Sequence, residues 1–212
     1  FLVQLPNPIH GVSLINQSIQ KNKTIKKKFN TRFIDISTTK KIDKIDLFEF
    51  RKIFTSINIY YRFLKCLLTF KPDKIYISLT ILGWGFIKDS ILVIISKLFN
   101  CKIIFHLHRK GLSKYANRSF FLKNYYKFIF KNADVIHLSK SLFKDIRKIK
   151  DPNTSSYVVN NGIYDQNFRK LKKNKIFTFI FVSNLFKSKG IDMLLKAILL
   201  LNKNNMSKKF QV

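Results

Sequence analysis

Acidic residues are scarce in this sequence, which has 11 Asp and Glu among 212 residues against 41 Lys and Arg, and a net charge of +30. Arginine is scarce as well, since 7 of these cations are Arg and 34 are Lys. Recognition of nucleic acid relies on the bidentate guanidinium fork, and the lysines are spread over nearly every segment. We therefore expect no nucleic-acid partner. The charge fits a lysine-rich solvated surface or one that lies on an anionic membrane.

Cysteine is limited to Cys66 and Cys101, and neither has CxxC or metal-ligand spacing. We expect buried free thiols in a reducing compartment. No basic-then-apolar signal peptide opens the chain. The most hydrophobic stretch, residues 77–99, is interrupted by Lys88 and Asp89, which argues against a membrane span. These absences predict a cytoplasmic location.

Short apolar runs alternate with longer amphipathic segments along the chain. The runs predict strands at 1–5, 32–37, 74–80, 102–107, 134–138, 157–160 and 176–183, and the longer segments predict helices at 11–20, 45–70, 85–99, 119–131, 140–149 and from about 190. This order predicts an α/β fold with a Rossmann-like parallel sheet. We expect one such domain over residues 1–165, a linker at 166–174, and the beginning of a second Rossmann-like domain at 175–212.

Two of these helices carry clear apolar stripes. On the helix at 85–99 the residues that share a face are Ile87, Ile91, Ile94, Ile95 and Leu98. On the last helix they are Ile191, Leu194, Leu195, Ile198 and Leu199, which we expect to be buried. The lysine runs 26–28 and 172–173 are expected in solvated loops.

Ligands of open α/β sheets bind where the strands end, and the first strand end leads through His10 to Gly11. A glycine at the start of a helix lets a ligand approach the backbone, and the free N–H groups there favour an anion. An ordinary turn between strand and helix would look the same.

His106 and His108 lie two residues apart at the end of another predicted strand, so their side chains should project together. The pair could hold a metal, act as a general base or contact a sugar. The nearby sequence has no third ligand at metal spacing, which disfavours the metal.

Two more strand ends are candidates. Asn161–Gly162 favours a turn with positive φ and is a weak signal by itself. Asn184 follows the strand at 176–183, and Lys189 precedes the last helix, where a lysine and a helix N-terminus suit a diphosphate. The spacing is not that of a P-loop.

Five segments in this order resemble glycosyltransferase family 4, whose members have the GT-B fold of two Rossmann-like domains. They are residues 6–16 (PNPIHGVSLIN), 102–111 (KIIFHLHRKG), 134–142 (DVIHLSKSL), 158–163 (VVNNGI) and 182–198 (VSNLFKSKGIDMLLKAI). The resemblance covers nearly the whole chain. It is to members of the family that act in bacterial surface-polysaccharide synthesis above all.

The resemblance implies a role for each candidate residue. His108 would be catalytic and touch the transferred sugar or the acceptor. Donor phosphates would lie against Gly11 and pair with Lys189, and Asn184 stands where many members have an Arg. The cleft would be lined by His10, His106, Asn161 and Gly162.

The resemblance further implies a retaining glycosyltransferase that moves a sugar from a nucleotide-sugar donor to a saccharide or lipid-linked acceptor. It would need no metal or other cofactor, because Lys189 and helix N-termini can take the diphosphate charge. The enzyme could be peripheral at the inner face of the plasma membrane. The alternative is a non-catalytic module that binds the acceptor.

The family has two paired glutamates in a later segment, and the sequence ends at Val212 before any such segment. We therefore expect a fragment that lacks roughly 150 residues of the second domain. Such a fragment should have little activity of its own.

Overall fold

The computed structural model describes residues 1–40, 50–162, 176–183, 189–203 and 210–211. The chain divides into two compact units, Phe1–Ile163 and Tyr164–Val212. The predicted linker at 166–174 lies outside the described residues.

The first unit is built on a six-stranded sheet in the order β2-β1-β3-β4-β5-β6, and every neighbouring pair is parallel. The strands are β1 (Leu2–Val3), β2 (Ile34–Asp35), β3 (Lys74–Ser78), β4 (Lys102–Leu107), β5 (Ala133–His137) and β6 (Ser156–Val158). The predicted α/β fold with a Rossmann-like parallel sheet is confirmed for this unit.

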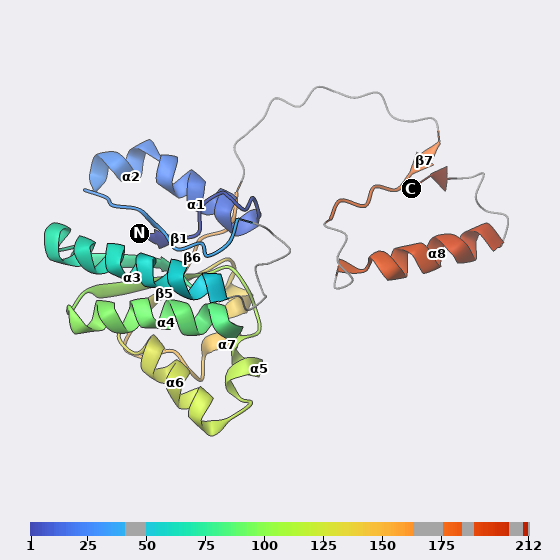
Figure 1. The fold of residues 1–212 in the computed structure, drawn as a ribbon. Coiled ribbons are helices and arrows are strands. Elements are labelled where there is room, and N and C mark those ends of the chain that lie inside the picture. The colour runs from blue at the N-terminus through green and yellow to red at the C-terminus, as the bar shows by residue number, and fades with distance from the viewer. Residues whose placement is uncertain (41–49, 163–175, 184–188, 204–209, 212) are drawn as a thin grey trace. The chain divides into compact units, whose positions relative to one another are not determined.

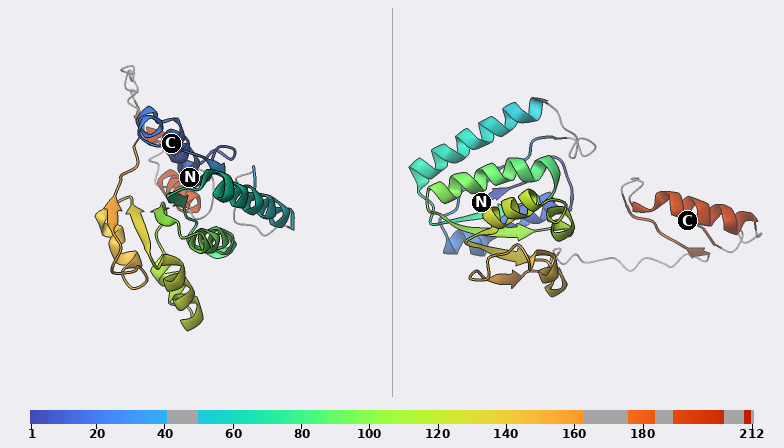
Figure 2. Two further views of the ribbon diagram at one scale, coloured as in Figure 1. Left: turned by 90° about the vertical axis from the view of Figure 1, so that its left-hand side faces the viewer. Right: turned by 90° about the horizontal axis from the view of Figure 1, so that it is seen from below.

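The helices of this unit are α1 (Gly11–Lys21), α2 (Lys23–Lys28), α3 (Phe50–Phe70), α4 (Gly83–Leu98), α5 (Leu112–Ala116), α6 (Phe120–Phe130) and α7 (Phe143–Ile146), with a 3₁₀ turn at Lys140–Leu142. Helix α4 contacts both α3 and α6, and the three form a layer on one side of the sheet (Figures 1 and 2). On the other face, the buried Asn16 of α1 donates a hydrogen bond to Ser78 of β3.

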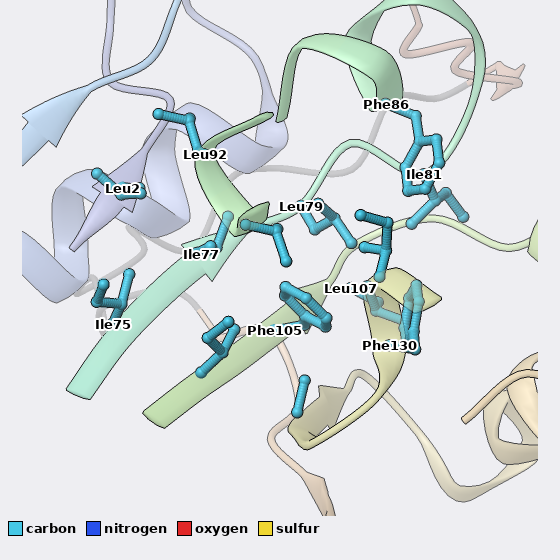
Figure 3. Packing of buried hydrophobic residues seen from close by; sticks show 14 of the residues in the cluster. Leu2, Ile75, Ile77, Leu79, Ile81, Phe86, Leu92, Phe105, Leu107 and Phe130 are labelled. Carbon is cyan, nitrogen blue, oxygen red and sulfur yellow. The ribbon is translucent and has the colours of Figure 1, made fainter. Parts of the chain in front are cut away.

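The hydrophobic core lies between the sheet and the layer of α3, α4 and α6. Alternate strand residues such as Ile77 and Phe105 point into it and share one cluster with Phe86 of α4 and Phe130 of α6 (Figure 3). The Phe105 and Phe130 rings are 5.0 Å apart. The remaining residues of β3 and β4 point to the opposite face; they are Lys74, Tyr76 and Ser78 of β3 and Lys102, Ile104 and His106 of β4, and all but Ile104 are polar.

Helix α4 buries a different face from the one that its isoleucines suggest. The buried residues are Phe86, Asp89, Ser90, Leu92, Val93 and Ser96. Ile87, Ile91 and Leu98 are exposed. The small residues let the helix approach closely, and a Cβ on Gly85 would lie 2.6 Å from Cγ2 of Thr80. Ile94 and Ile95 are half-buried and pack against the core, so the predicted stripe faces away from it at Ile87, Ile91 and Leu98.

A buried ion pair joins the ends of the first three strands. Asp89 is fully buried, and its carboxylate lies 2.8 Å from Nζ of Lys88 and accepts a 2.9 Å hydrogen bond from the Thr80 backbone N–H. Lys88 Nζ also donates to the Ile36 carbonyl, and Gln4 Nε2 donates to the Thr80 hydroxyl. Thus Gln4 after β1, Ile36 after β2 and Thr80 after β3 belong to one network.

The second unit contains β7 (Phe177–Thr178), α8 (Ile191–Lys203) and β8 (Phe210–Gln211), and the two strands are parallel. A strand, a helix and a parallel strand form the elementary unit of Rossmann-like folds. No residue of α8 is buried, and Leu195 and Leu199 are exposed. The expectation of a buried stripe on this helix is therefore wrong for the structure described.

One smaller difference has a simple cause. Residues 26–28, three lysines expected in a loop, form the last turn of α2. The helix dipole favours cations at this end, and Asn22 caps the first turn of the helix.

Of the described helices, none is both long and apolar enough to cross a membrane.

We predict that Asp89→Ala lowers the free energy of unfolding by about 3–5 kcal/mol, because Lys88 is then left largely buried without its partner. Asp73→Ala is the control, since Asp73 is exposed and its loss should cost within about 0.5 kcal/mol. Urea unfolding of both variants measures the difference. Equal stability of the two variants would contradict a structural role for the pair.

Candidate functional site

The site lies at the edge where the parallel strands end, which we call the carboxyl edge. Strand β1 lies between β2 and β3, so the chain winds in opposite directions on either side of β1. Ligands of open α/β sheets bind outside the carboxyl ends at such a reversal. The segments that meet there are the loops after β1, β3 and β4.

The loop after β1 is fixed by hydrogen bonds to α1. His10 caps this helix, because its backbone N–H donates to the Ser13 hydroxyl and its Nδ1 accepts from the Ser13 backbone N–H. The Asn16 amide donates to the Gln4 carbonyl and the Ser78 hydroxyl at 3.0 and 3.2 Å. Helix α1 thus presents its N-terminus at the carboxyl edge in a defined orientation.

Gly11 is the first residue of α1 and is exposed. A Cβ at this position would meet no atom within 4 Å, and its φ lies outside the left-handed region. Neither packing nor backbone conformation therefore requires a glycine here. The open space lies beside the first helical turn, where the Ser13 N–H is bonded to His10 and an anion is favoured at the N–H groups that remain.

His106 and His108 lie together, as predicted, with ring centroids 4.0 Å apart. His106 is buried, and its Nδ1 forms a short hydrogen bond with the hydroxyl of Tyr76 on the neighbouring strand. Burial raises the pKa of Tyr76 far above its ordinary value, so its hydroxyl keeps the proton and donates it to Nδ1. We assign the ring proton of His106 to Nε2 on this ground.

Three of the histidines at this edge, His10, His106 and His108, are neutral at pH 7. Burial lowers the pKa of His106 to about 3, with smaller effects of His108 and His137. Burial lowers the pKa of His108 to about 4, with a smaller coulombic effect of His10 when that ring is protonated. The pKa of His10 is lowered by burial as well. Neutral imidazoles donate and accept hydrogen bonds, but they cannot neutralise a phosphate.

Three buried nitrogen atoms of this cluster lack a hydrogen-bond partner among the described residues. They are Nε2 of His106 and both ring nitrogens of His108. Most buried polar side-chain atoms in proteins are hydrogen-bonded, and unpaired ones concentrate at functional sites or beside unseen water. The protein covers these atoms almost completely, so a ligand with hydroxyl groups would pair with them only after neighbouring side chains move.

The loop after β4 is held by a carboxylate from α7. Asp145 accepts hydrogen bonds from the backbone N–H groups of Gly111, Leu112 and Ser113 at 2.8, 3.0 and 3.3 Å. Gly111 has φ +116°, a conformation that favours glycine. The anchored loop contains the exposed cations Arg109 and Lys110 directly after His108.

Two of the other predicted residues, Asn161 and Gly162, are not brought to these histidines. Asn161 and Gly162 are exposed beyond the edge strand β6, two strands from β4. Neither has a positive φ, so the expected turn is absent. Asn184 lies outside the described residues. Lys189 is exposed in the second unit, two residues before α8.

Tyr76, Asn16 and Asp145 were missed by sequence reasoning. Tyr76 and Ser78 are two residues apart on β3, as His106 and His108 are at the end of β4, so each pair lies on one face of its strand. This shared spacing was the signal in the sequence that could have indicated Tyr76. Asp145 gave no local signal, because its partners are more than 30 residues away in the sequence.

The described part of the chain contains no group of three His, Cys, Asp or Glu side chains arranged to hold a metal ion. Fold and site define a Rossmann-like α/β unit with a cluster of neutral histidines at its carboxyl edge. No known family model, curated protein or solved structure matches the chain.

The buried histidines predict a loss of stability in acid. An imidazole with a lowered pKa binds its proton in the unfolded chain, near pH 6.5, before it does so in the folded protein. Above pH 6.5 these histidines therefore do not lower the free energy of unfolding, and that free energy decreases as the pH falls from 6.5 toward 4. Each histidine contributes a slope of at most about 1.4 kcal/mol per pH unit in that window.

We expect His108→Gln to flatten the pH dependence of the unfolding free energy between pH 6.5 and 4.5. Chemical unfolding at several pH values measures it. His137→Gln serves as a comparison, since the pKa of His137 is also lowered but its ring packs on Phe143 outside the cluster. A slope in His108→Gln equal to that of the wild type would show that His108 already carries its proton in the fold.

Proposed function

We propose that the chain belongs to a retaining glycosyltransferase of the GT-B type, in which the first unit binds the acceptor and the second contributes to the binding of a nucleotide-sugar donor. The reaction transfers a sugar to a hydroxyl group of a saccharide or lipid-linked acceptor. It uses no resident cofactor.

The observation that carries the proposal is the cluster of His10, His106 and His108 at the carboxyl edge. Sugars are recognised through many hydroxyl groups, each of which can donate and accept a hydrogen bond. Neutral imidazoles with unpaired nitrogens have the same two abilities. A phosphate-binding site would need cations or free N–H groups instead.

The beginning of α1 supplies such N–H groups. Gly11 leaves its backbone accessible at the start of this helix of 11 residues, and a phosphate placed there is stabilised by the helix dipole. Arg109 and Lys110 add positive charge after β4. In this proposal the histidines bind the sugar of a sugar phosphate, and the N–H groups of α1 with the two cations bind its phosphate, all at one sheet edge.

The proposed reaction breaks the bond between the anomeric carbon and the phosphate oxygen and forms a bond to the acceptor oxygen on the same face of the sugar. The acceptor proton passes to the departing phosphate oxygen. His108 holds a hydroxyl group of the transferred sugar or the acceptor in place. The N–H groups of α1 stabilise charge on the leaving group.

Lys189 is the proposed diphosphate ligand of the second unit. It is exposed and lies just before α8, a helix of 13 residues, and Gly190 between them has φ +84°. A cation and a helix N-terminus in sequence suit a diphosphate.

A second candidate is a module that binds a saccharide without catalysis. The hydroxyl-binding histidines would serve it equally well. It differs from the enzyme in one measurable property, because it would not turn over a nucleotide sugar.

We predict that His108→Ala lowers the transfer rate by about 10²-fold or more, a loss of about 3 kcal/mol of transition-state binding, and leaves nucleotide binding largely intact. The assay uses the protein expressed from its complete reading frame, nucleotide sugars and lipid-linked acceptors, with mass spectrometry of the products. NMR of the anomeric proton should show retention.

His137→Gln is the matched control, because His137 ends the adjacent strand but lies on the opposite face of the sheet from His106. It should keep nearly full activity. Saccharide binding without any turnover of nucleotide sugar would favour the binding module, and neither binding nor turnover would refute both candidates.

We also predict that Lys189→Ala weakens binding of nucleoside diphosphates by about 10- to 100-fold, since a charge-assisted hydrogen bond is worth about 1.5–3 kcal/mol. Isothermal calorimetry of UDP, GDP and ADP measures this, with Lys196→Ala on the exposed middle of α8 as the control. Tight binding that does not change in Lys189→Ala would place the diphosphate elsewhere.

A further inference from the structure

Helix α3 has two apolar faces. One packs on the core through Ile59, Phe63 and Leu67. The other is exposed and follows helical spacing over nearly the full length of the helix; it consists of Ile53, Phe54, Ile57, Tyr61, Leu64 and Leu68. Phe54 and Tyr61 are 74% and 66% exposed. A surface helix of a globular protein normally presents polar residues on that side.

The neighbouring helix α4 continues this surface. Its exposed stripe of Ile87, Ile91 and Leu98 faces away from the core, and α3 and α4 are in contact within the layer on one side of the sheet (Figures 1 and 2). We call these two stripes together the outer face. Contiguous exposed apolar surface of this kind marks an interaction site.

Charge decides between the possible occupants of the outer face. Arg51, Arg62 and Lys65 are exposed on α3 and border its stripe. Helix α3 contains no acidic residue, and Asp89 of α4 is buried and paired. A second copy would bring the same cations and the same net charge of +30 against this surface. An anionic surface meets no such repulsion.

We propose that the outer face docks on a membrane that contains anionic lipid, with the apolar stripes of α3 and α4 inserted at the level of the headgroups. A helix with aromatic and aliphatic side chains on one side and Arg and Lys beside them has the composition of an interfacial helix. The cations contact lipid phosphates while the apolar side chains leave water. This docking does not depend on the transfer reaction.

Flotation with phosphatidylcholine vesicles, with and without phosphatidylglycerol, tests the proposal. The test variant carries Phe54→Ser, Ile57→Ser and Tyr61→Ser. The control carries Ile9→Ser, Leu14→Ser and Phe29→Ser, three exposed apolar residues outside α3 and α4. Both variants keep the charge of the wild type, and thermal unfolding checks that both are folded.

We expect the wild type and the control to float with anionic vesicles, and the α3 variant to bind them at least about tenfold more weakly, because burial of even one such side chain is worth a factor of that order. Trp84, at the start of α4, is the single Trp of the chain. Its emission should shift to shorter wavelength on anionic vesicles, and raised salt should reduce binding.

Two results would overturn the proposal. Equal binding of both triple variants, abolished by salt, would mean adsorption by charge spread over the whole surface. A dimer in light scattering that the α3 variant loses, without vesicle binding by the wild type, would mean that a second copy covers the outer face.

Discussion

The carboxylate of Asp89 is the group on which the arrangement of the carboxyl edge depends. It is fully buried, and the contacts that compensate for its burial come from Lys88 and the Thr80 backbone. Through Lys88 it reaches Ile36, and through Thr80 it reaches Gln4. A buried charge tolerates little change in geometry, because each lost contact leaves it without solvation. The ends of β1, β2 and β3 are thus held by an electrostatic requirement as well as by packing.

The two faces of the sheet serve different purposes. One face supplies Ile77 and Phe105 to the hydrophobic core. The other supplies Tyr76, Ser78 and His106, which are polar and hydrogen-bonded to one another or to α1. The period of a strand separates the two sets, so stability and the proposed ligand contacts come from alternate residues of the same strands. A substitution on the polar face changes the site with little loss of apolar burial.

The sequence predicted the features that depend on local period. The bounds of β4 and the contact between His106 and His108 came from a run of β-branched and aromatic residues and from the spacing of the pair. The register that pairs Tyr76 with Ile104, and so brings its hydroxyl to His106 on the same face of the sheet, is tertiary and has no local signature. The isoleucine stripe of α4 predicted an apolar face, but it did not predict which face of the helix packs on the sheet. The side with Asp89, Ser90 and Ser96 is buried because its small residues let the helix come closer to the sheet.

At position 11 the stability of the fold and the approach of a ligand favour different residues. A helix gains about 1 kcal/mol when an interior glycine is replaced by alanine, and somewhat less at its first turn, and the space for the methyl group is open. Folding alone would therefore favour alanine here. Any selection that retains glycine during divergence acts on what approaches the helix N-terminus. Position 11 is thus a place where natural variation among relatives would report on the ligand independently of the stability of the protein.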